Sequence, residues 1–357
     1  MTQWLQPLPT SPHREQTADL LKGIGVLLMI QVHLVELFAT EEIYHSTVGH
    51  IALFLGGPPA APVFMAVMGY FLANTNKTLP QLLRRGVLLI LGGILLNIGL
   101  NMNLLIGIYS GRFALDPYAY IFGADILPLA GLSTICIALV RVIFKQSFIA
   151  YLMLAAVVSS VGSVLPHLES AGNALVSYLL PFFGGNSWWS YFPFFPWLTY
   201  PLVGCAARLL LHRIAFPITN KPFTTGLALV FFAGLVATMQ YASAITADLP
   251  SYYHHGPLFA LWTSVFLGGW TLLTFFAVTS FPQSRALLYL SWLGRNVTTA
   301  YVFQWLLIGN IATEVYQTQQ GTQVFMWLLL VVILTSVLMT LWQQVRKQLI
   351  SAPASSS

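Results

Sequence analysis

Four ionisable side chains lie in one apolar stretch near the start of the chain, ADLLKGIGVLLMIQVHLVELFA at residues 18–39. Asp19 and Lys22 come early in this stretch, and His33 and Glu36 come late. A cation can hold an anionic group such as a phosphate, and an imidazole beside a carboxylate can take up and release a proton. At membrane depth an ionisable side chain usually faces a bundle interior or a wet cavity. The four residues are therefore candidates for a site with acid–base chemistry.

The spacing of these residues places them on one face of a helix. Lys22 and His33 are eleven residues apart, which at about 100° per residue returns almost to the starting angle and rises ~16 Å. Asp19 and Glu36 each lie three residues from a partner, close enough for the side chains to meet. Simpler interpretations stay open. Asp19 and Lys22 could form an ion pair at the helix entrance, with Lys22 reaching the interface. His33 could be a core residue with its hydrogen bonds made inside the protein, and Glu36 could be an interfacial residue.

The helix that carries this face is predicted to lie in a membrane. The chain has 357 residues, of which 57% are hydrophobic and 7% are charged, whereas a soluble domain has roughly 25% charged residues. Apolar windows of about 20 residues predict ten transmembrane helices, without a cleavable signal peptide. The windows are 18–39, 52–73, 83–107, 119–142, 147–165, 193–211, 223–243, 257–280, 294–314 and 323–344. We expect an all-α, polytopic transmembrane helix bundle.

Loop charges set the expected orientation of this bundle. The Lys and Arg residues of the loops gather on one side, and Arg112 is the single cation of the opposite side. The positive-inside rule therefore predicts that both termini are cytoplasmic. The chain divides into a cytoplasmic segment 1–17, one transmembrane domain 18–345 and a cytoplasmic tail 346–357. The outer segment 166–192 is too broken by Pro and Gly to be a span, so it is expected to lie in the interface or to re-enter the bundle.

Composition also limits the kinds of partner. The net charge is +5, but its one-sided distribution follows from membrane orientation, so we expect a lipid bilayer and no nucleic acid. Cys136 and Cys205 both fall in apolar runs, which supports neither a disulfide framework nor a metal site. A homodimer is left open. Because no soluble domain is found, any chemistry must be carried out by the bundle.

Two further residues are expected near the outer level of His33. Asp125, in YIFGADILPLAGLS, is predicted to lie about two turns into a helix that enters from outside. Its alternatives are a helix cap or a hydrogen bond to a neighbouring helix. His50 precedes the second span at its outer end and could join His33 across a short loop. His254 and His255 are expected to be solvated loop residues.

Other candidates lie at the inner end and in an aromatic run. Arg295 and Asn296 open the ninth span, and Arg85 lies near the start of the third. Arg295 could hold an anion or could act as a positive-inside anchor. Gln304 follows in the ninth span after about two and a half turns. Trp197 ends the run WWSYFPFFPW, which either forms an interfacial belt or lines a pocket.

These stretches resemble the motifs of polytopic membrane acyltransferases. Asp19, Lys22-Gly23 and His33 are similar to the superfamily's acidic residue, Arg-Gly and functional His or Asn, with Lys22 losing the bidentate fork of an arginine. Three more stretches agree in order: PVFMAVMGYFLA (62–73), YFPFFPWLTYPLVGCAARLL (191–210) and LGRNVTTAYVFQWLLI (293–308). In the last stretch, glutamine replaces the usual histidine. The resemblance is closest to the branch of heparan-α-glucosaminide N-acetyltransferase and its bacterial relatives.

The resemblance implies a cytosolic acyl-CoA donor, an extracytoplasmic sugar hydroxyl or amine as acceptor, and location in a bacterial inner membrane. His33 or His50 would be the general base, with Glu36 or Asp125 orienting the imidazole. Residues assigned to the acetyl-CoA are Asp19, Lys22, Arg85, Arg295 and Asn296, and those assigned to the acceptor are Trp197 and Gln304. The alternative is a transporter or flippase of a small polar or glycan-like substrate, although the two halves lack matching broken helices.

Overall fold

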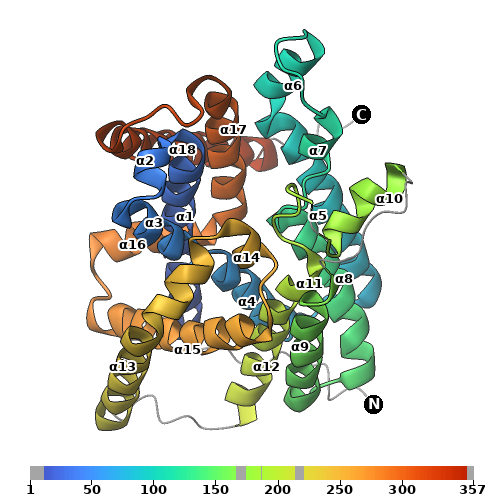
Figure 1. Ribbon diagram of the computed structural model, residues 1–357. Helices are drawn as coiled ribbons and strands as arrows, with labels where there is room; N and C mark the ends of the chain where they lie inside the picture. Colours follow the sequence, from blue (N-terminus) through green and yellow to red (C-terminus); the bar gives the residue numbers. More distant parts are fainter. Residues whose placement is uncertain (1–11, 166–173, 186, 214–220, 352–357) are drawn as a thin grey trace.

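The computed structural model describes residues 12–165, 174–185, 187–213 and 221–351, and its regular elements are helices (Figure 1). Those before residue 165 are α1 (Pro12–Phe38), α2 (Glu41–Tyr44), α3 (Thr47–Gly56), α4 (Ala61–Leu72), α5 (Leu79–Leu100), α6 (Met102–Tyr109), α7 (Pro117–Ile121), α8 (Ile126–Phe144) and α9 (Phe148–Gly162). Those after it are α10 (Ala174–Leu179), η3 (Leu180–Phe182), α11 (Phe194–Trp197), α12 (Thr199–Arg213), α13 (Lys221–Thr246), α14 (Leu249–Tyr253), α15 (Pro257–Ser280), α16 (Arg285–Arg295), α17 (Val297–Val315) and α18 (Gly321–Ser351). Residues 1–11 of the predicted N-terminal segment and 352–357 of the predicted tail lie outside the described ranges.

Eight segments of the described chain are long and apolar enough to cross a membrane. They are Glu15–Phe38, Thr47–Leu72, Leu79–Leu100, Ile126–Phe144, Phe194–Arg213, Pro222–Thr246, Pro257–Ser280 and Gly321–Leu349. The two other predicted windows, 147–165 and 294–314, correspond to α9 and α17, which have 15 and 19 residues. The all-α polytopic bundle is therefore confirmed, and within the described ranges eight of the ten predicted windows correspond to segments with the length and composition of a span.

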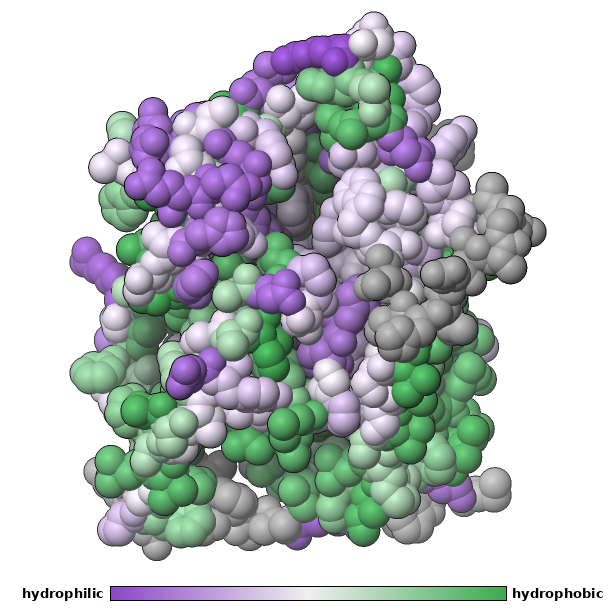
Figure 2. All heavy atoms as spheres, in the orientation of Figure 1, coloured by the Kyte–Doolittle hydropathy of each residue, from purple (hydrophilic) through white to green (hydrophobic). Residues whose placement is uncertain are grey.

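Large apolar side chains cover the outside of this bundle. Leu95 on α5, Val230 on α13 and Met326 on α18 are 70%, 71% and 69% exposed. Figure 2 shows hydrophobic residues over the lower half of the molecule and hydrophilic residues gathered at its upper end, around α2. Such a surface matches hydrocarbon rather than water. The chain is an integral, multi-pass membrane protein.

Helix α1 lies at the centre of the packing. It contacts α3, α4, α15, α16, α17 and α18. In its first half it crosses α16 very closely. A Cβ added to Gly23 would overlap the carbonyl of Leu290, and one added to Gly294 would overlap the carbonyl of Asp19. These glycines belong to the Lys22-Gly23 and LGRN stretches, so the crossing explains why both stretches contain Gly.

A second close crossing joins α4 to α12. A Cβ added to Gly69 would overlap the carbonyl of Pro201, and one added to Gly204 would overlap that of Ala66. Both glycines lie in the stretches 62–73 and 191–210, which the sequence singled out. The glycines of all four stretches thus mark the points where helix backbones meet.

Helix α1 runs parallel to the chain that contains α17. Near its start, α1 meets Gly294. Beyond its end, the backbone N–H of Gln319 donates to the Phe38 carbonyl at 2.8 Å, and that of Thr40 donates to the Gln319 carbonyl at 3.0 Å. The two segments are therefore fixed to each other at both ends.

The predicted second span is broken. Thr47–Leu72 consists of α3 and α4, separated by turns at residues 57–60. Pro58 and Pro59 cause the break, since a proline has no backbone N–H and disfavours a helical residue before it.

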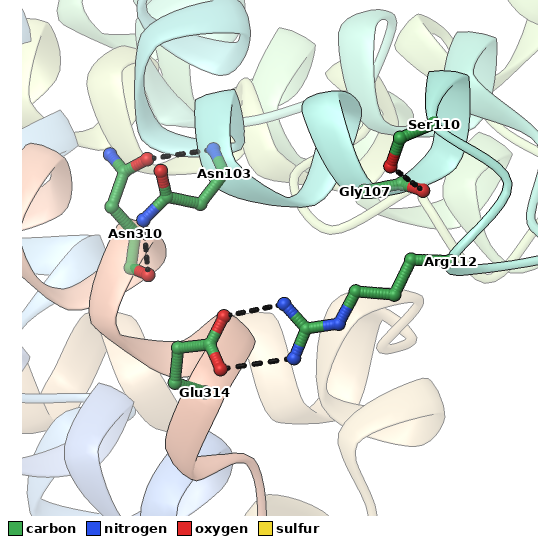
Figure 3. Close-up of polar contacts among 6 residues, drawn as sticks. All are labelled: Asn103, Gly107, Ser110, Arg112, Asn310 and Glu314. Atoms are coloured by element: carbon green, nitrogen blue, oxygen red, sulfur yellow. Dashed lines mark hydrogen bonds and ion pairs between the residues drawn. The ribbon is translucent and has the colours of Figure 1, made fainter.

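The far end of α17 is tied to α6, as Figure 3 shows. Asn103 donates from its backbone N–H to Asn310 Oδ1 at 3.0 Å and from its side-chain amide to the Asn310 carbonyl at 3.2 Å. Arg112 makes two parallel bonds to Glu314, at 2.8 and 3.0 Å. These four bonds anchor α17, which carries several residues of the candidate site.

Candidate functional site

His33 and Glu36 form a hydrogen-bonded pair on α1. Nδ1 of His33 lies 3.2 Å from Glu36 Oε2, and the side chains are 12% and 15% exposed. Because a carboxylate oxygen accepts, Nδ1 carries the ring proton and Nε2 of a neutral imidazole keeps its lone pair. A base whose second nitrogen is held by a carboxylate is the arrangement that general-base catalysis uses.

Two residues of α17 extend this site. The rings of His33 and Trp305 have centroids 4.1 Å apart and an interplanar angle of 38°. One turn before Trp305, the hydroxyl of Tyr301 donates to Asp125 Oδ2 at 2.6 Å. Asp125 also interacts electrostatically with His33. The structure thus brings together His33, Glu36 and Asp125, three of the four residues predicted to do acid–base chemistry.

Asp125 is the N-cap of α8, so its predicted position two turns into a helix is wrong. Its Oδ1 accepts from the backbone N–H of Ile126 at 2.6 Å. The preceding turn is held by Asn97, whose amide donates to the carbonyls of Ile121 at 3.2 Å and Gly123 at 2.9 Å. Both carboxyl oxygens of Asp125 are engaged by other groups, and Glu36 is the residue bonded to the imidazole.

Two tyrosines that sequence reasoning did not single out lie near the same carboxylates. Tyr191 and Tyr253 each interact electrostatically with Glu36 and Asp125. Their rings make a T-shaped contact with centroids 5.6 Å apart. In the sequence they are two of 15 tyrosines, and only the fold distinguishes them.

The outer segment 166–192 supplies one of these tyrosines. Residues 166–173 and 186 lie outside the described chain. In the remainder, the backbone N–H of Phe192 donates to the Ala124 carbonyl at 2.7 Å, and Ala124 N–H donates to the Trp189 carbonyl at 2.8 Å. Irregular backbone of the segment therefore packs directly beside Asp125.

The residues assigned to the other end of α1 are only partly gathered. Lys22 forms an ion pair with Asp19, with 3.0 Å between Nζ and Oδ1, and Gly294 beside Arg295 lies against Asp19. Arg295 is exposed at the end of α16. Asn296 donates its amide to the Trp292 carbonyl at 2.8 Å, so it acts locally between α16 and α17.

Arg85 is separate from this group. It is exposed on α5, a helix that packs mainly against α8 and also contacts α17. Helix α1 is not among these main neighbours, so the packing gives no support for grouping Arg85 with Lys22.

No hydrogen bond or ion pair links His50 to His33 among the described residues, where His33 is bonded to Glu36, so their pairing stays a prediction. His50 is exposed on α3, where it lines a groove of about 340 Å³ with Phe54 of the same helix and Met239 and Ser243 of α13. His33 instead faces α17. Helix α3 contacts both α1 and α13, and the groove that His50 lines lies on the α13 side.

Trp197 and Gln304 are both fully buried. Trp197 donates its indole N–H to the Tyr253 carbonyl at 2.8 Å and packs edge-on against Tyr200 and Tyr252. It is therefore part of an aromatic core, neither an interfacial belt nor an exposed pocket wall. Gln304 lies on α17 directly before Trp305, whose ring contacts that of His33.

Two titratable side chains outside the candidate site are buried, and one of them, His255, was expected to be a solvated loop residue. Arg208 is 1% exposed, donates to the Tyr70 hydroxyl at 3.0 Å and lies 5.1 Å from the centre of that ring. His255 is 2% exposed and bonded at both nitrogens, to the Tyr252 carbonyl and the Tyr200 hydroxyl, each at 2.7 Å. Burial lowers the pKa of His255 to about 4, so it is a neutral structural residue.

A metal is not indicated by the geometry. Among the described residues, no group of three or more His, Cys, Asp or Glu side chains is placed to hold a metal ion. Acid–base chemistry at His33 is what the arrangement can perform.

Fold and site together define a multi-pass membrane protein with a histidine–carboxylate pair on its central helix. Residues 16–342 match the family model described as an acyltransferase domain. Because this match covers nearly the whole chain, the protein belongs to that acyltransferase family and is a transferase. Searches of curated proteins and of solved structures gave no match.

Proposed function

We propose that the protein transfers an acetyl group from cytoplasmic acetyl-CoA to a sugar hydroxyl or amine on the other side of the membrane. Family membership supports acyl transfer, and the resemblance to the heparan-α-glucosaminide N-acetyltransferase branch favours this donor and acceptor. The observation that carries the proposal is the 3.2 Å contact between His33 and Glu36 in a part-buried position, beside Asp125 and Tyr301.

His33 acts as the general base. Its Nε2 takes the proton of the acceptor O–H or N–H while the acceptor atom attacks the thioester carbonyl. The carbon–sulfur bond then breaks, and the thiolate takes the proton from the imidazolium, which gives the acylated acceptor and free CoA. Glu36 keeps Nδ1 protonated and stabilises the positive ring. Positioned acid–base catalysis of this kind contributes typically 10²–10⁴-fold.

The acetyl-CoA phosphates bind at the first turns of α1. Lys22 has three N–H donors, so it can hold a phosphate oxygen while it stays bonded to Asp19. Arg295 lies on the neighbouring helix α16 and adds a second cation. Asn296 and Arg85 are less suited, since Asn296 is engaged by Trp292 and Arg85 lies on α5.

The acceptor binds among Tyr191, Tyr253 and Trp305. Sugar rings present apolar C–H faces and polar hydroxyls. Aromatic side chains can pack against the C–H faces, and the carboxylates of Glu36 and Asp125 can accept hydrogen bonds from the hydroxyls. Since Trp197 is enclosed in the aromatic core, its predicted contact with the acceptor has no support in the fold.

The test compares His33→Ala with His45→Ala in purified protein in lipid nanodiscs. His45 also pairs with a glutamate, at 3.1 Å from Glu41, but that pair is exposed and outside the site, which makes it a matched control. CoA release from radiolabelled acetyl-CoA, with an added amino sugar, should fall about 10²–10⁴-fold in the first variant and stay unchanged in the second.

Equal rates for His33→Ala and the wild type would refute the assignment of the base. Uptake of a polar substrate into liposomes, without any acyl transfer, would instead support the transporter or flippase alternative.

A further inference from the structure

Gln304 has an unsatisfied side chain deep in the bundle. It is 0% exposed, and both Oε1 and Nε2 lack a hydrogen-bond partner. By contrast, Gln31 on α1 donates its amide to the Ala52 carbonyl at 2.8 Å. A buried polar group without a partner costs stability, and in a native protein it indicates a ligand or water that completes its bonding.

The helical neighbours of Gln304 place it beside the middle of α1. Ala300 and Ile308, one turn before and after it, pack in the same cluster as Val26 and Ile30 of α1. Those two α1 residues lie between Lys22 and His33 in the sequence. Gln304 therefore faces the part of the bundle between the cation and the imidazole.

The level of Gln304 is close to that of His33. Trp305, whose ring lies tilted against that of His33, is the next residue of α17. Because α1 and α17 run parallel, Gln304 lies about 1.5 Å nearer the Lys22 end than Trp305 does, the rise of one helical residue.

We propose that Gln304 binds an amide of the pantetheine arm of the acyl-CoA donor, an inference that rests on the proposed function. A side-chain carboxamide and a chain amide are complementary: the Gln304 N–H donates to the arm's carbonyl, and the arm's N–H donates to Gln304 Oε1. Both unsatisfied atoms are then bonded by one ligand group. A phosphate or a carboxylate, which only accept, would satisfy Nε2 alone.

The length of the arm agrees with this placement. About 12 bonds join the phosphate ester oxygen to the sulfur, and an extended chain covers roughly 1.2 Å per bond, or ~14 Å. The rise from Lys22 to His33 is ~16 Å. With the phosphates at Lys22 and the thioester at His33, the amide nearer the sulfur falls within roughly 5 Å of the thioester, near the level of Gln304.

The experiment measures equilibrium binding to the full-length protein in nanodiscs, so it needs no acceptor. Two probes are used: CoA, which has the arm, and adenosine 3′,5′-bisphosphate, which lacks it. Gln304→Leu should weaken CoA binding about 5- to 100-fold through two lost hydrogen bonds and should leave the bisphosphate unaffected. Lys22→Gln should weaken both probes. If the leucine variant folds poorly, Gln304→Met replaces it in the same measurement, because methionine is similar in size to glutamine.

Thermal stability without ligand gives an independent readout. Because Gln304 is unpartnered in the free protein, both apolar variants should raise the unfolding midpoint. A lowered midpoint, unchanged CoA binding or equal weakening of both probes would overturn the proposal. If the wild type bound neither probe, the donor of the proposed function would be wrong, and this inference would fall with it.

Discussion

The bond between Tyr301 and Asp125 offers a test of the site that is independent of catalysis. The hydroxyl lies 2.6 Å from Oδ2, and Tyr301 is 5% exposed. Tyr301→Phe keeps the ring and removes the donor, which leaves one carboxyl oxygen of the α8 cap without its partner. A bond of this kind contributes about 1–3 kcal/mol when its partner is left buried, so the free energy of unfolding should fall by that amount.

Tyr289→Phe is the matched control. The Tyr289 hydroxyl lies 2.8 Å from Ser336 Oγ in an exposed contact, where water replaces the lost partner, so the change should stay within about 0.5 kcal/mol. The assay is equilibrium unfolding in mixed detergent micelles, followed by tryptophan fluorescence. A double-mutant cycle with Asp125→Ala should show coupling between Tyr301 and Asp125. Equal effects of the two phenylalanine variants, or no coupling, would show that the bond is not formed.

Three further perturbations follow from the geometry. Burial lowers the pKa of His255 to about 4, whereas the pKa in the unfolded chain is 6.5. The unfolded state therefore binds a proton first, and the free energy of unfolding should fall as the pH drops from 6.5 to 4. His255→Gln should reduce this pH dependence in thermal unfolding scans. Gly294→Val should separate α16 from α1 because its side chain would meet the Asp19 carbonyl; a loss of several kcal/mol in stability is expected, whereas unchanged unfolding would contradict the close crossing. Arg112 lowers the pKa of Glu314 through their hydrogen bonds, so amide exchange at the end of α17 should stay slow at pH 5 in the wild type and speed up in Arg112→Ala.

Sequence patterns predicted the local features of the site well. Asp19 with Lys22, and His33 with Glu36, were expected to meet because they are three residues apart, and the structure confirms both contacts. Such pairs depend only on helix geometry. The apolar windows likewise located the helices, because the hydrophobicity of a segment can be calculated from that segment alone.

Features that depend on tertiary packing were not predictable in the same way. The proximity of Asp125 to His33 was expected, but its role as a cap depends on the turn held by Asn97. The surroundings of His50 were not predictable either, since the groove that it lines is formed with Met239 and Ser243 of α13, which are distant in the sequence. The unsatisfied amide of Gln304 appears only once its neighbours on α1 and α17 are known.

The parallel attachment of α1 to residues 294–319 fixes the relative heights of the side chains on these two segments. The segments are attached at one point by the crossing of Gly23 and Gly294, and at another by the hydrogen bond from Gln319 N–H to the Phe38 carbonyl. If the proposed acyl-CoA donor binds along these two segments, its thioester lies at one fixed height for every acyl chain. In the proposed function, a longer acyl chain would then extend past His33 toward the groups proposed to bind the acceptor, so the two specificities would be coupled.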